Sequence, residues 1–429
     1  MAAEDTIFAL ATAQGKAGVA VVRLSGPQSV QVLEALGASA PKPRATRLVH
    51  LRDRDGGLLD HALVLHFAEG ASFTGEAVIE LHLHGSVAVV RAVLRAIEGT
   101  GLARQAEAGE FTRRALMNDR LDLTQVQGLG DMIEADTEVQ RRHALRVFSG
   151  EMAERVTAWR NAILRAAALV EATIDFADED VPVDVAPEVM ELLEGVAADL
   201  RHEVSGAAVA SRIRSGFEVA LVGPPNVGKS SLINALTRSE AAIVSDIAGT
   251  TRDVIEVRLD LDGLPVTILD MAGLRDSSDP IERMGIDRAV KRATAADIRV
   301  FLMEVDEDWD ERVALQEGDL RVRAKVDLYG GEGISAVSGA GIPEFLQALS
   351  ERLQQRVATA GLVTADRHVE LYRLAMVELD GLDADQIREA PELFSEVLRK
   401  VACDLRQVIG GVDTEAILGE IFASFCIGK

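Results

Sequence analysis

The stretch FEVALVGPPNVGKSSLINAL, residues 217–236, has the pattern of a buried strand, a glycine-rich turn and the start of a helix. Gly223, Gly228, Lys229 and Ser230 match the pattern G-x-x-x-x-G-K-[ST]. In such a turn the backbone amides surround a β-phosphate, the lysine reaches the β- and γ-phosphate oxygens, and the serine hydroxyl suits Mg²⁺. Because a strand and a helix flank the motif, a chance match is less frequent than for the motif alone, and we expect a P-loop.

Three further segments follow in the order that GTPases use. AGTTRD (248–253) offers Thr251 as a second Mg²⁺ ligand in a loop that senses the γ-phosphate. LDMAGLR (269–275) ends a strand with Asp270 near the metal and offers the Gly273 amide to the γ-phosphate. AKVD (324–327) occupies the guanine-reading position, and SAVSG (335–339) is the loop behind the base. Together these segments predict a P-loop GTPase.

Two departures from the usual GTPase pattern have consequences. Leu274 stands where Ras-like enzymes have a water-orienting Gln, and it can neither donate nor accept a hydrogen bond, so water activation must come from elsewhere. AKVD has Ala324 in place of the usual Asn, whereas Asp327 can still pair with the guanine N1–H and exocyclic amine. If the missing amide contact is normally buried, its loss costs about 1–3 kcal/mol. We therefore predict guanine specificity with weakened affinity, which equal binding of GTP and ATP would contradict.

The rest of the chain predicts a multidomain α/β and α fold. Residues 1–118 contain β-rich runs at 18–26, 61–70 and 77–86 and a helical pattern at 87–101, which predicts an N-terminal α+β domain. Residues 119–215 and 356–429 have helical spacing, with a break at 181–187, whereas 216–355 alternate strands and helices. We expect the P-loop α/β domain to be inserted into a discontinuous helical domain.

Composition limits the binding partners and the cellular compartment that we expect for this protein. The 429 residues carry a formal charge of −24, which argues against broad, non-specific nucleic-acid binding, so any RNA contact must be local, transient or made by a basic partner. Cys403 and Cys426 are the only cysteines and cannot form a disulfide framework. The N-terminus lacks the pattern of an export signal, and no apolar run is long enough to span a membrane. We expect a cytoplasmic protein.

Motifs spread over the whole chain resemble those of one family. They are DTIFALAT (5–12), GVAVVRLSGP (18–27), SFTGE (72–76), IELHLHG (79–85), AGEFTRRALMNDRLDLTQ (108–125), NVGKSSLINAL (226–236), GTTRD (249–253), GLRDSSDPIERMGIDRA (273–289) and the terminal FCIGK (425–429). In order and spacing the chain resembles the MnmE (TrmE) family of tRNA modification GTPases over essentially its full length. The resemblance implies a folate-binding-like N-terminal domain, which also mediates dimerisation, a helical domain and an inserted GTPase domain.

The resemblance also implies a one-carbon pocket at the N-terminal domain, against which the C-terminal motif packs. Its ligand would be 5-formyl- or 5,10-methylene-tetrahydrofolate, held by Arg23, Glu80, Arg120 and Lys429. A carboxylate such as that of Glu80 can read the amide and amine edges of a pterin, and cations suit the glutamate tail. Arg120 stands where the family usually has Lys, so the charge is kept while the geometry differs. The alternative for Arg23 is a solvated edge residue that follows a strand.

In the GTPase segment, the resemblance implies a K⁺ ion in place of an arginine finger, with the GTPase domains dimerising on it. The K⁺ ligands would be Asn226, the main-chain oxygens of Ser245 and Ile247, and Thr250. A cation against the phosphates supplies charge stabilisation of the kind that an arginine finger gives. Glu282 corresponds to the water-positioning carboxylate of the family and would compensate for Leu274. From the residues alone, Glu282 is a surface helix residue.

The complete set of sites implied by the resemblance is larger. The catalytic set is Lys229, Gly249, Thr250, Thr251, Asp270, Gly273 and Glu282. Mg²⁺ would be held by Ser230 and Thr251. The nucleotide-binding set is Asn226, Val227, Gly228, Lys229, Ser230, Ser231, Ser245, Asp246, Ile247, Ala248, Gly249, Thr250, Thr251, Asp270, Met271, Ala272, Gly273, Lys325, Asp327, Ser335 and Ala336. Met271 replaces the usual Thr of the family.

Three other features have competing interpretations. Cys426 could be a thiol nucleophile, but no His partner is evident, and we favour a buried, inert cysteine. His82 and His84 alternate on one strand, but without nearby carboxylate or Cys ligands of matching spacing we favour a structural role. The basic cluster RRHALR (141–146) is the best local candidate for RNA or partner contact, although a solvated helix face is the simpler interpretation.

The resemblance also implies a function. With a flavin-dependent partner similar to MnmG (GidA), in a heterotetramer, a homodimeric K⁺-stimulated GTPase would add an aminomethyl-type group to C5 of the tRNA wobble uridine, using a folate carbon. Ammonium and glycine both remain open as nitrogen donors. The alternatives are a ribosome-assembly GTPase switch, for which no basic RNA-binding module is visible, and a stand-alone folate-dependent transferase, which leaves the GTPase segment unexplained. Titration with a reduced folate distinguishes the tRNA-modification hypothesis from the ribosome-assembly hypothesis, because the latter predicts no folate binding.

Overall fold

The computed structural model describes residues 5–175, 184–239, 241–243, 256–270, 290–304, 313–363, 365–410 and 428. The chain divides into two compact units, Met1–Gly130 with Arg406–Lys429, and Asp131–Leu405. Among the described residues, none of the helices combines the length and the hydropathy that crossing a bilayer requires.

The first unit is built on a six-stranded sheet of order β3-β4-β5-β2-β1-β6. Neighbouring strands are antiparallel except β1 and β6, which are parallel. The strands are β1 (Ile7–Leu10), β2 (Val19–Ser25), β3 (Thr46–Arg52), β4 (Leu58–Phe67), β5 (Val78–His84) and β6 (Arg104–Gln105), and the helices are α1 (Ser29–Ala35), α2 (Val87–Glu98) and α3 (Glu110–Met117).

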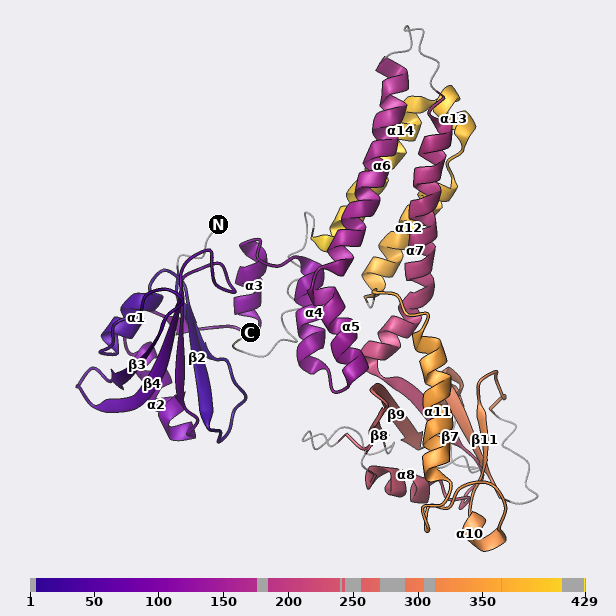
Figure 1. Cartoon of the computed structure of the whole chain (residues 1–429), viewed down its shortest axis with the longest axis horizontal. Coiled ribbons are helices and arrows are strands. Elements are labelled where there is room, and N and C mark those ends of the chain that lie inside the picture. The colour runs from indigo at the N-terminus through magenta and orange to yellow at the C-terminus, as the bar shows by residue number, and fades with distance from the viewer. Residues whose placement is uncertain are drawn as a thin grey trace, which may run out of the picture. The chain divides into compact units, whose positions relative to one another are not determined.

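One face of this sheet is buried under helices. Alternation in β2 directs Val22 into the core and Arg23 to the opposite face. Leu33 of α1 and Val93 of α2 pack into the same buried cluster as Val22 and Leu81, so both helices cover that face (Figure 1). On the opposite face, Arg23 lies beside a smaller buried cluster that contains Ala9 of β1 and Phe111 of α3.

The second unit contains a five-stranded sheet of order β11-β10-β7-β9-β8, in which only β8 runs antiparallel. Hydrophobic residues of α8 and α11 share a core cluster with Val219 and Leu221 of β7, so both helices cover one face of the sheet (Figure 1). The elements are β7 (Phe217–Val222), α8 (Lys229–Thr237), β8 (Glu256–Leu261), β9 (Leu264–Asp270), β10 (Ile298–Met303), β11 (Leu320–Arg323), α10 (Val326–Tyr329) and α11 (Ile342–Val357).

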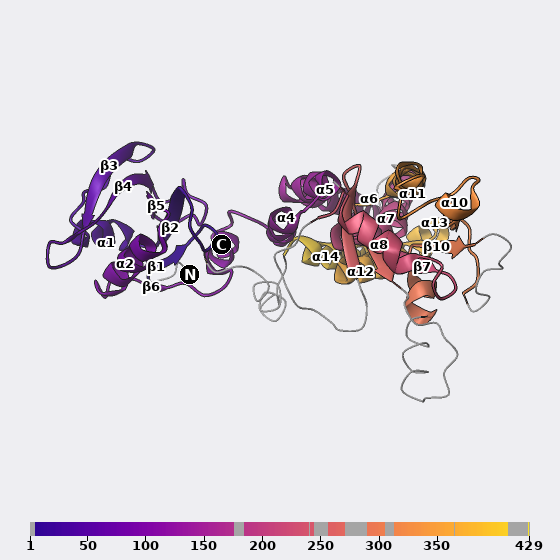
Figure 2. The same cartoon turned by 90° about the horizontal axis from the view of Figure 1, so that it is seen from below.

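The same unit holds a set of long helices, in which α6 and α7 run side by side with α12 and α14 (Figures 1 and 2). Trp159 of α6 donates its indole N–H to Asp199 of α7 at 2.9 Å, and its ring meets Tyr372 of α12 edge to face. The helices are α5 (Glu138–Phe148), α6 (Glu151–Asp175), α7 (Ala186–Ser215), α12 (Asp366–Asp380), α13 (Ala384–Glu389) and α14 (Pro391–Ile409), while α4 (Leu123–Glu134) and α14 each contribute residues to both units.

The expected fold class is confirmed: an N-terminal α+β part, helical segments on both sides of a P-loop sheet, and a parallel α/β arrangement in the middle. The strand runs expected at 18–26, 61–70 and 77–86 correspond to β2, β4 and β5. The sequence patterns did not predict β3 or α1. The domain limits at 118, 215 and 355 stay a prediction.

Candidate functional site

The P-loop follows β7 and begins α8. A Cβ at Gly223 would overlap the carbonyl oxygen of Leu302 on neighbouring β10, so only glycine fits there. Gly228 has a left-handed conformation with φ of 113° and caps α8. The buried Lys229 ammonium donates to the carbonyl oxygens of Gly223 at 2.7 Å and Pro224 at 2.9 Å. The lysine therefore lies across the loop that would surround the phosphates.

A hydroxyl and a carboxylate meet beside this loop. The Ser230 hydroxyl donates to Oδ2 of Asp270 at 2.9 Å. Asp270 ends β9, where it pairs with Leu221 across the parallel strands, and it is 3% exposed. Among the described residues its buried Oδ1 has no hydrogen-bond partner. Since a buried acceptor without a partner is costly, this oxygen fits a hydrated Mg²⁺ ion, and the site has the donor set for that metal.

The loop expected to read guanine lies at the same edge of the sheet, because it follows the carboxyl end of β11. Lys325 is left-handed with φ of 59° and caps the single turn of α10, which carries the exposed Asp327. Ser335 is buried, and its hydroxyl accepts from the amides of Val337 and Ser338 at 3.3 and 3.1 Å. These bonds shape the loop expected behind the base.

The structure describes some of the predicted site residues and not others. Asn226, Val227, Gly228, Lys229, Ser230, Ser231, Asp270, Lys325, Asp327, Ser335 and Ala336 are described and lie on elements that end or begin at this edge. The following predicted residues lie outside the described ranges: Ser245, Asp246, Ile247, Ala248, Gly249, Thr250, Thr251, Met271, Ala272, Gly273, Leu274, Glu282, Cys426 and Lys429. Their roles stay predictions.

The first unit brings together two of the residues expected to bind folate. Arg23 of β2 and Glu80 of β5 are paired in register, and Nε of Arg23 donates to Glu80 Oε1 at 2.9 Å. The guanidinium also lies over the rings of Phe73 and Phe111, 5.9 and 5.8 Å from their centroids. Arg120 packs its aliphatic stem near Gly75. The pair thus has an aromatic support that holds the Arg23 guanidinium in place.

The C-terminal segment reaches this unit at one described position. Gly428 is buried with φ of 104°, and a Cβ there would overlap the carbonyl oxygen of Leu10 at the end of β1. The neighbouring residue Ala9 pairs with Arg23 in the sheet. Gly428 therefore packs one residue along β1 from the partner of Arg23.

Sequence reasoning missed a buried ionic network in the same unit. The guanidinium of Arg114 is bonded to Glu76 at 3.1 Å, to Glu110 at 2.9 Å and to Asp5 at 2.8 Å. Burial raises the pKa of Glu110, but hydrogen bonds from Arg104, the Glu107 amide and Arg114 outweigh it and lower the pKa to about 2. Glu76 lies in SFTGE, Glu110 and Arg114 lie in AGEFTRRAL, and Asp5 begins DTIFALAT, so the charged positions of these motifs were the available signal.

The remaining candidates have local partners. His84 Nδ1 lies 2.7 Å from Asp60, and His82 Nε2 lies 3.5 Å from Glu80, so each ring does have a carboxylate nearby, contrary to expectation. Within the described residues no group of three possible metal ligands forms, and the structural role of the two histidines stays a prediction. In the 141–146 cluster, the three arginines pair with Glu138 or Glu151 on the same surface.

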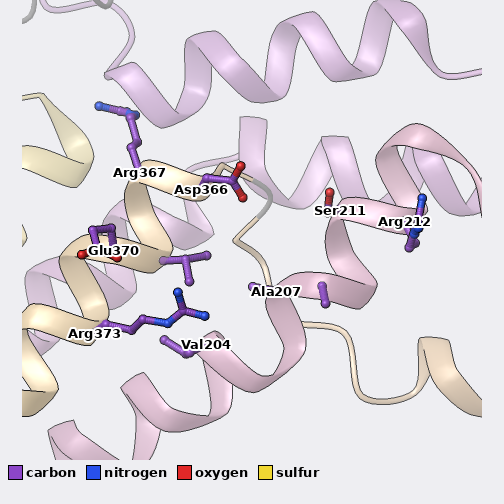
Figure 3. Close-up of a pocket in the computed structure, with 10 residues that line it drawn as sticks. Val204, Ala207, Ser211, Arg212, Asp366, Arg367, Glu370 and Arg373 are labelled. Atoms are coloured by element: carbon purple, nitrogen blue, oxygen red, sulfur yellow. The ribbon is translucent and has the colours of Figure 1, made fainter. Parts of the chain in front are cut away.

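A separate cavity of about 660 Å³ lies between α7 and α12. Figure 3 shows Arg373 extending from α12 toward Val204 on α7, with Glu370 beside it. Arg212, at the other end, is engaged with Asp297 at 3.1 Å. None of the residues that line this cavity belongs to the predicted nucleotide or folate sites.

A parallel sheet with a phosphate loop, a Ser–Asp pair suited to Mg²⁺ and a base-reading loop at one edge defines a P-loop nucleotide-binding protein. Family models agree: the MnmE helical domain matches residues 123–426, and the GTP-binding protein TrmE N-terminus matches residues 6–120. The chain belongs to the MnmE family of tRNA modification GTPases. The expected P-loop GTPase class and the resemblance are thereby confirmed.

Curated relatives match over their full length. The tRNA modification GTPase MnmE of Cereibacter sphaeroides is 57% identical, with 99% of this chain and 100% of the relative covered. The protein of the same name from Roseobacter denitrificans is 54% identical with the same coverage. Among solved structures, the cytosolic domain of the T. maritima FeoB iron transporter in its GMPPNP form matches with a TM-score of 0.25 at 17% identity, covering 45% of this chain and 98% of that one.

Proposed function

We propose that this chain couples K⁺-stimulated GTP hydrolysis to the addition of a (carboxymethyl)aminomethyl group at C5 of the tRNA wobble uridine. A folate one-carbon unit would supply the carbon, and a flavin-dependent partner similar to MnmG (GidA) would share the reaction, in a heterotetramer with a homodimer of this chain. The observation that carries the proposal is full-length membership of the MnmE family, in a chain that holds a P-loop in one unit and the Arg23–Glu80 pair in the other.

In the nucleotide site, the described residues have defined tasks. Lys229 and the amides around Gly228 would bind the phosphates, and the Ser230 hydroxyl and Asp270 would hold hydrated Mg²⁺. Asp327 would read the guanine N1–H and exocyclic amine. Thr251, Gly273 and Glu282 are assigned by the resemblance to the second metal contact, the γ-phosphate and the attacking water. Bound Mg²⁺ would contribute neutralisation of the charge that develops on the phosphates.

For K⁺, the proposal rests on Asn226, which lies within the P-loop and has a left-handed backbone with φ of 65°. Its expected co-ligands are Ser245, Ile247 and Thr250. Hydrolysis should be faster in KCl than in NaCl at equal ionic strength, and Asn226→Ala should remove that difference while leaving GDP affinity in NaCl nearly unchanged. Asn234→Ala, on the exposed side of α8, is the matched control and should keep the K⁺ response.

For folate, the Arg23–Glu80 pair, Arg120 and Lys429 form the proposed set. Glu80 presents a half-buried carboxylate that a pterin amide edge can meet, while Arg23 and Arg120 supply positive charge for the acidic tail. The position of Gly428 against β1 supports a role for the C-terminal segment in this pocket. Binding of 5-formyl-tetrahydrofolate by the chain also separates this function from a ribosome-assembly switch, which predicts no folate binding.

The deciding experiment is mass spectrometry of wobble uridines from cells with and without this chain. The modified nucleoside should disappear on deletion and return with the wild-type chain. Glu80→Gln should fail to restore it while retaining GTP hydrolysis, and Glu98→Gln, an exposed carboxylate of the same unit, should restore it fully. Unchanged wobble uridines in the deletion strain would contradict the proposal.

A further inference from the structure

Glu304, the first residue after β10, contacts the guanine-reading loop at two points. Its Oε1 accepts a hydrogen bond from the Lys325 ammonium, and its Oε2 accepts one from the Tyr329 hydroxyl at 3.3 Å. Lys325 caps α10 at its start and Tyr329 is the last residue of α10. One carboxylate therefore spans the whole helical turn that carries Asp327.

The same turn is also held by a backbone hydrogen bond, in which the Val326 amide donates to the Ile334 carbonyl at 3.3 Å. α10 has four residues and none of them is buried, and Leu328 and Tyr329 are largely exposed. Lys325 adopts a left-handed conformation, which a non-glycine residue adopts at a cost in free energy unless surrounding contacts determine it. Such a short element needs tertiary contacts to keep one orientation.

The side chain at position 324 cannot form a hydrogen bond that would hold the loop. Ala324 is only 6% exposed and packs in the hydrophobic core of the sheet, while its backbone N–H donates to the Met303 carbonyl at 2.9 Å. A polar side chain at this position would be buried close to the ends of β10 and β11. The methyl group of Ala324 offers no hydrogen bond, so the loop depends on a group from a neighbouring strand.

Glu304 comes from the strand that also supports the P-loop. In the sheet Phe301 of β10 pairs with Val222, the last residue of β7, and Gly223 packs on the Leu302 carbonyl. A contact between Glu304 and α10 thus connects the loop expected to read the base to the strand on which the phosphate loop rests.

We propose that Glu304 is a positioning residue for guanine recognition. Its carboxylate holds Lys325 and Tyr329 so that α10 presents Asp327 to the base, and it takes the place of a side-chain amide at position 324. This inference rests on the proposed function, because it requires that the loop around Asp327 binds guanine.

The test compares GDP with inosine diphosphate, whose base lacks the exocyclic amine that Asp327 would read. In the full chain, Glu304→Gln should weaken GDP binding about fivefold, as expected for loss of a partly exposed charged contact together with its hydroxyl partner. Inosine diphosphate should lose less affinity than GDP. The Kd of inosine diphosphate divided by the Kd of GDP should therefore fall roughly twofold. KM for GTP should rise while kcat at saturating GTP stays the same. Glu332→Gln, an exposed carboxylate in the same region, should behave as the wild type.

Two further variants make the outcome decisive. Tyr329→Phe removes only the hydroxyl and should shift GDP affinity and the ratio in the same direction by a smaller amount, and it carries the test if Glu304→Gln does not fold. Ala324→Asn in the Glu304→Gln background should recover part of the GDP affinity. Wild-type behaviour of Glu304→Gln, or equal losses for both nucleotides, would overturn the role of Glu304. A wild-type chain that binds no guanine nucleotide would instead overturn the proposed function.

Discussion

At the scale of single residues, Asp270 is the group in the phosphate site whose surroundings are incomplete. Its Oδ2 accepts from Ser230, whereas its buried Oδ1 has no partner among the described residues. A buried carboxylate oxygen without a partner is costly to the folded chain, and a cation or its bound water would remove that cost by binding to it. The sequence motif predicted the location of Asp270 near the metal but not this asymmetry.

Asp270→Asn should therefore impair the response to Mg²⁺ more than nucleotide binding as such. The Mg²⁺ concentration for half-maximal GTP hydrolysis should rise about 10- to 100-fold, the range seen when groups around a metal are altered. Asp327→Asn is the control, because it should weaken guanine binding equally at every Mg²⁺ concentration. An Mg²⁺ titration of GTPase activity measures both, and an unshifted midpoint for Asp270→Asn would exclude the carboxylate from the metal site.

Gly428→Ala should release the C-terminal segment from β1, since the added Cβ overlaps the Leu10 carbonyl and φ is 104°. Strain of roughly 1–3 kcal/mol corresponds to about a 5- to 150-fold loss of affinity for a ligand that needs this segment. Calorimetric titration with 5-formyl-tetrahydrofolate measures it. Gly101→Ala is the matched control, because φ is 68° there and no atom lies within 4 Å of the added Cβ. Equal folate affinity in both variants would separate the C-terminal segment from the pocket.

What the sequence could predict at this scale depends on locality. Lys229, Ser230 and Gly228 lie within one turn, so the motif alone placed them correctly beside one another. Glu304 and its partner Lys325 are 21 positions apart and meet because β10 and β11 are neighbours. No spacing rule marks Glu304, and only the sheet order shows that its carboxylate faces α10.

At the scale of elements, the connection between α11 and α12 is clamped by helices from earlier in the chain. Glu203 of α7 is 1% exposed and accepts from the Leu362 amide at 2.8 Å and from Arg155 of α6 at 2.6 Å. A Cβ at Gly206 would overlap the backbone of Gly361, so the two segments cross in close contact. The helical spacing of 186–215 predicted α7, but it did not predict that Glu203 turns inward.

This junction also contains a titratable group with a defined effect on stability. Burial first, and then the charge of Arg146, lower the pKa of His143 to about 4. The unfolded chain has a histidine pKa of about 6.5, so it binds protons in a range where the folded chain does not. Stability from the neutral ring is complete above about pH 6.5 and is lost as the pH falls to 4, by about 3 kcal/mol in all.

His143→Gln should remove that part of the pH dependence. Thermal or urea unfolding of the wild type and the variant between pH 7 and 4.5 measures the difference, and the two stability curves should converge as the pH falls. His368, whose pKa burial lowers to about 3, titrates in both proteins and cancels in the comparison. Parallel curves would show that His143 is not held in its neutral form.

At the scale of the whole chain, the charge of −24 and the arrangement of the arginines both argue against strong binding to RNA phosphates. The cluster at 141–146 was the best local candidate for RNA contact, yet Arg141 and Arg142 pair with Glu138, and Arg146 pairs with Glu151. Such exposed pairs are weak, but they lower the local positive charge that a phosphate would meet. The linear sequence shows the basic run, and only the helix places the acidic partners beside it.

The isolated chain should therefore bind tRNA weakly and with little dependence on salt. Since log K falls with log salt concentration by about 0.9 for each phosphate neutralised on a duplex, a slope smaller in magnitude than about 3 is expected for the chain alone. Addition of the proposed flavin-dependent partner should raise both the affinity and the slope, because under that proposal the partner supplies most of the cations. Glu138→Gln, which frees Arg141 and Arg142, should steepen the slope of the isolated chain, whereas Glu194→Gln, exposed on α7, should leave it unchanged. Filter binding across a salt series measures each value, and a steep slope for the wild-type chain alone would show that it carries a phosphate-binding surface of its own.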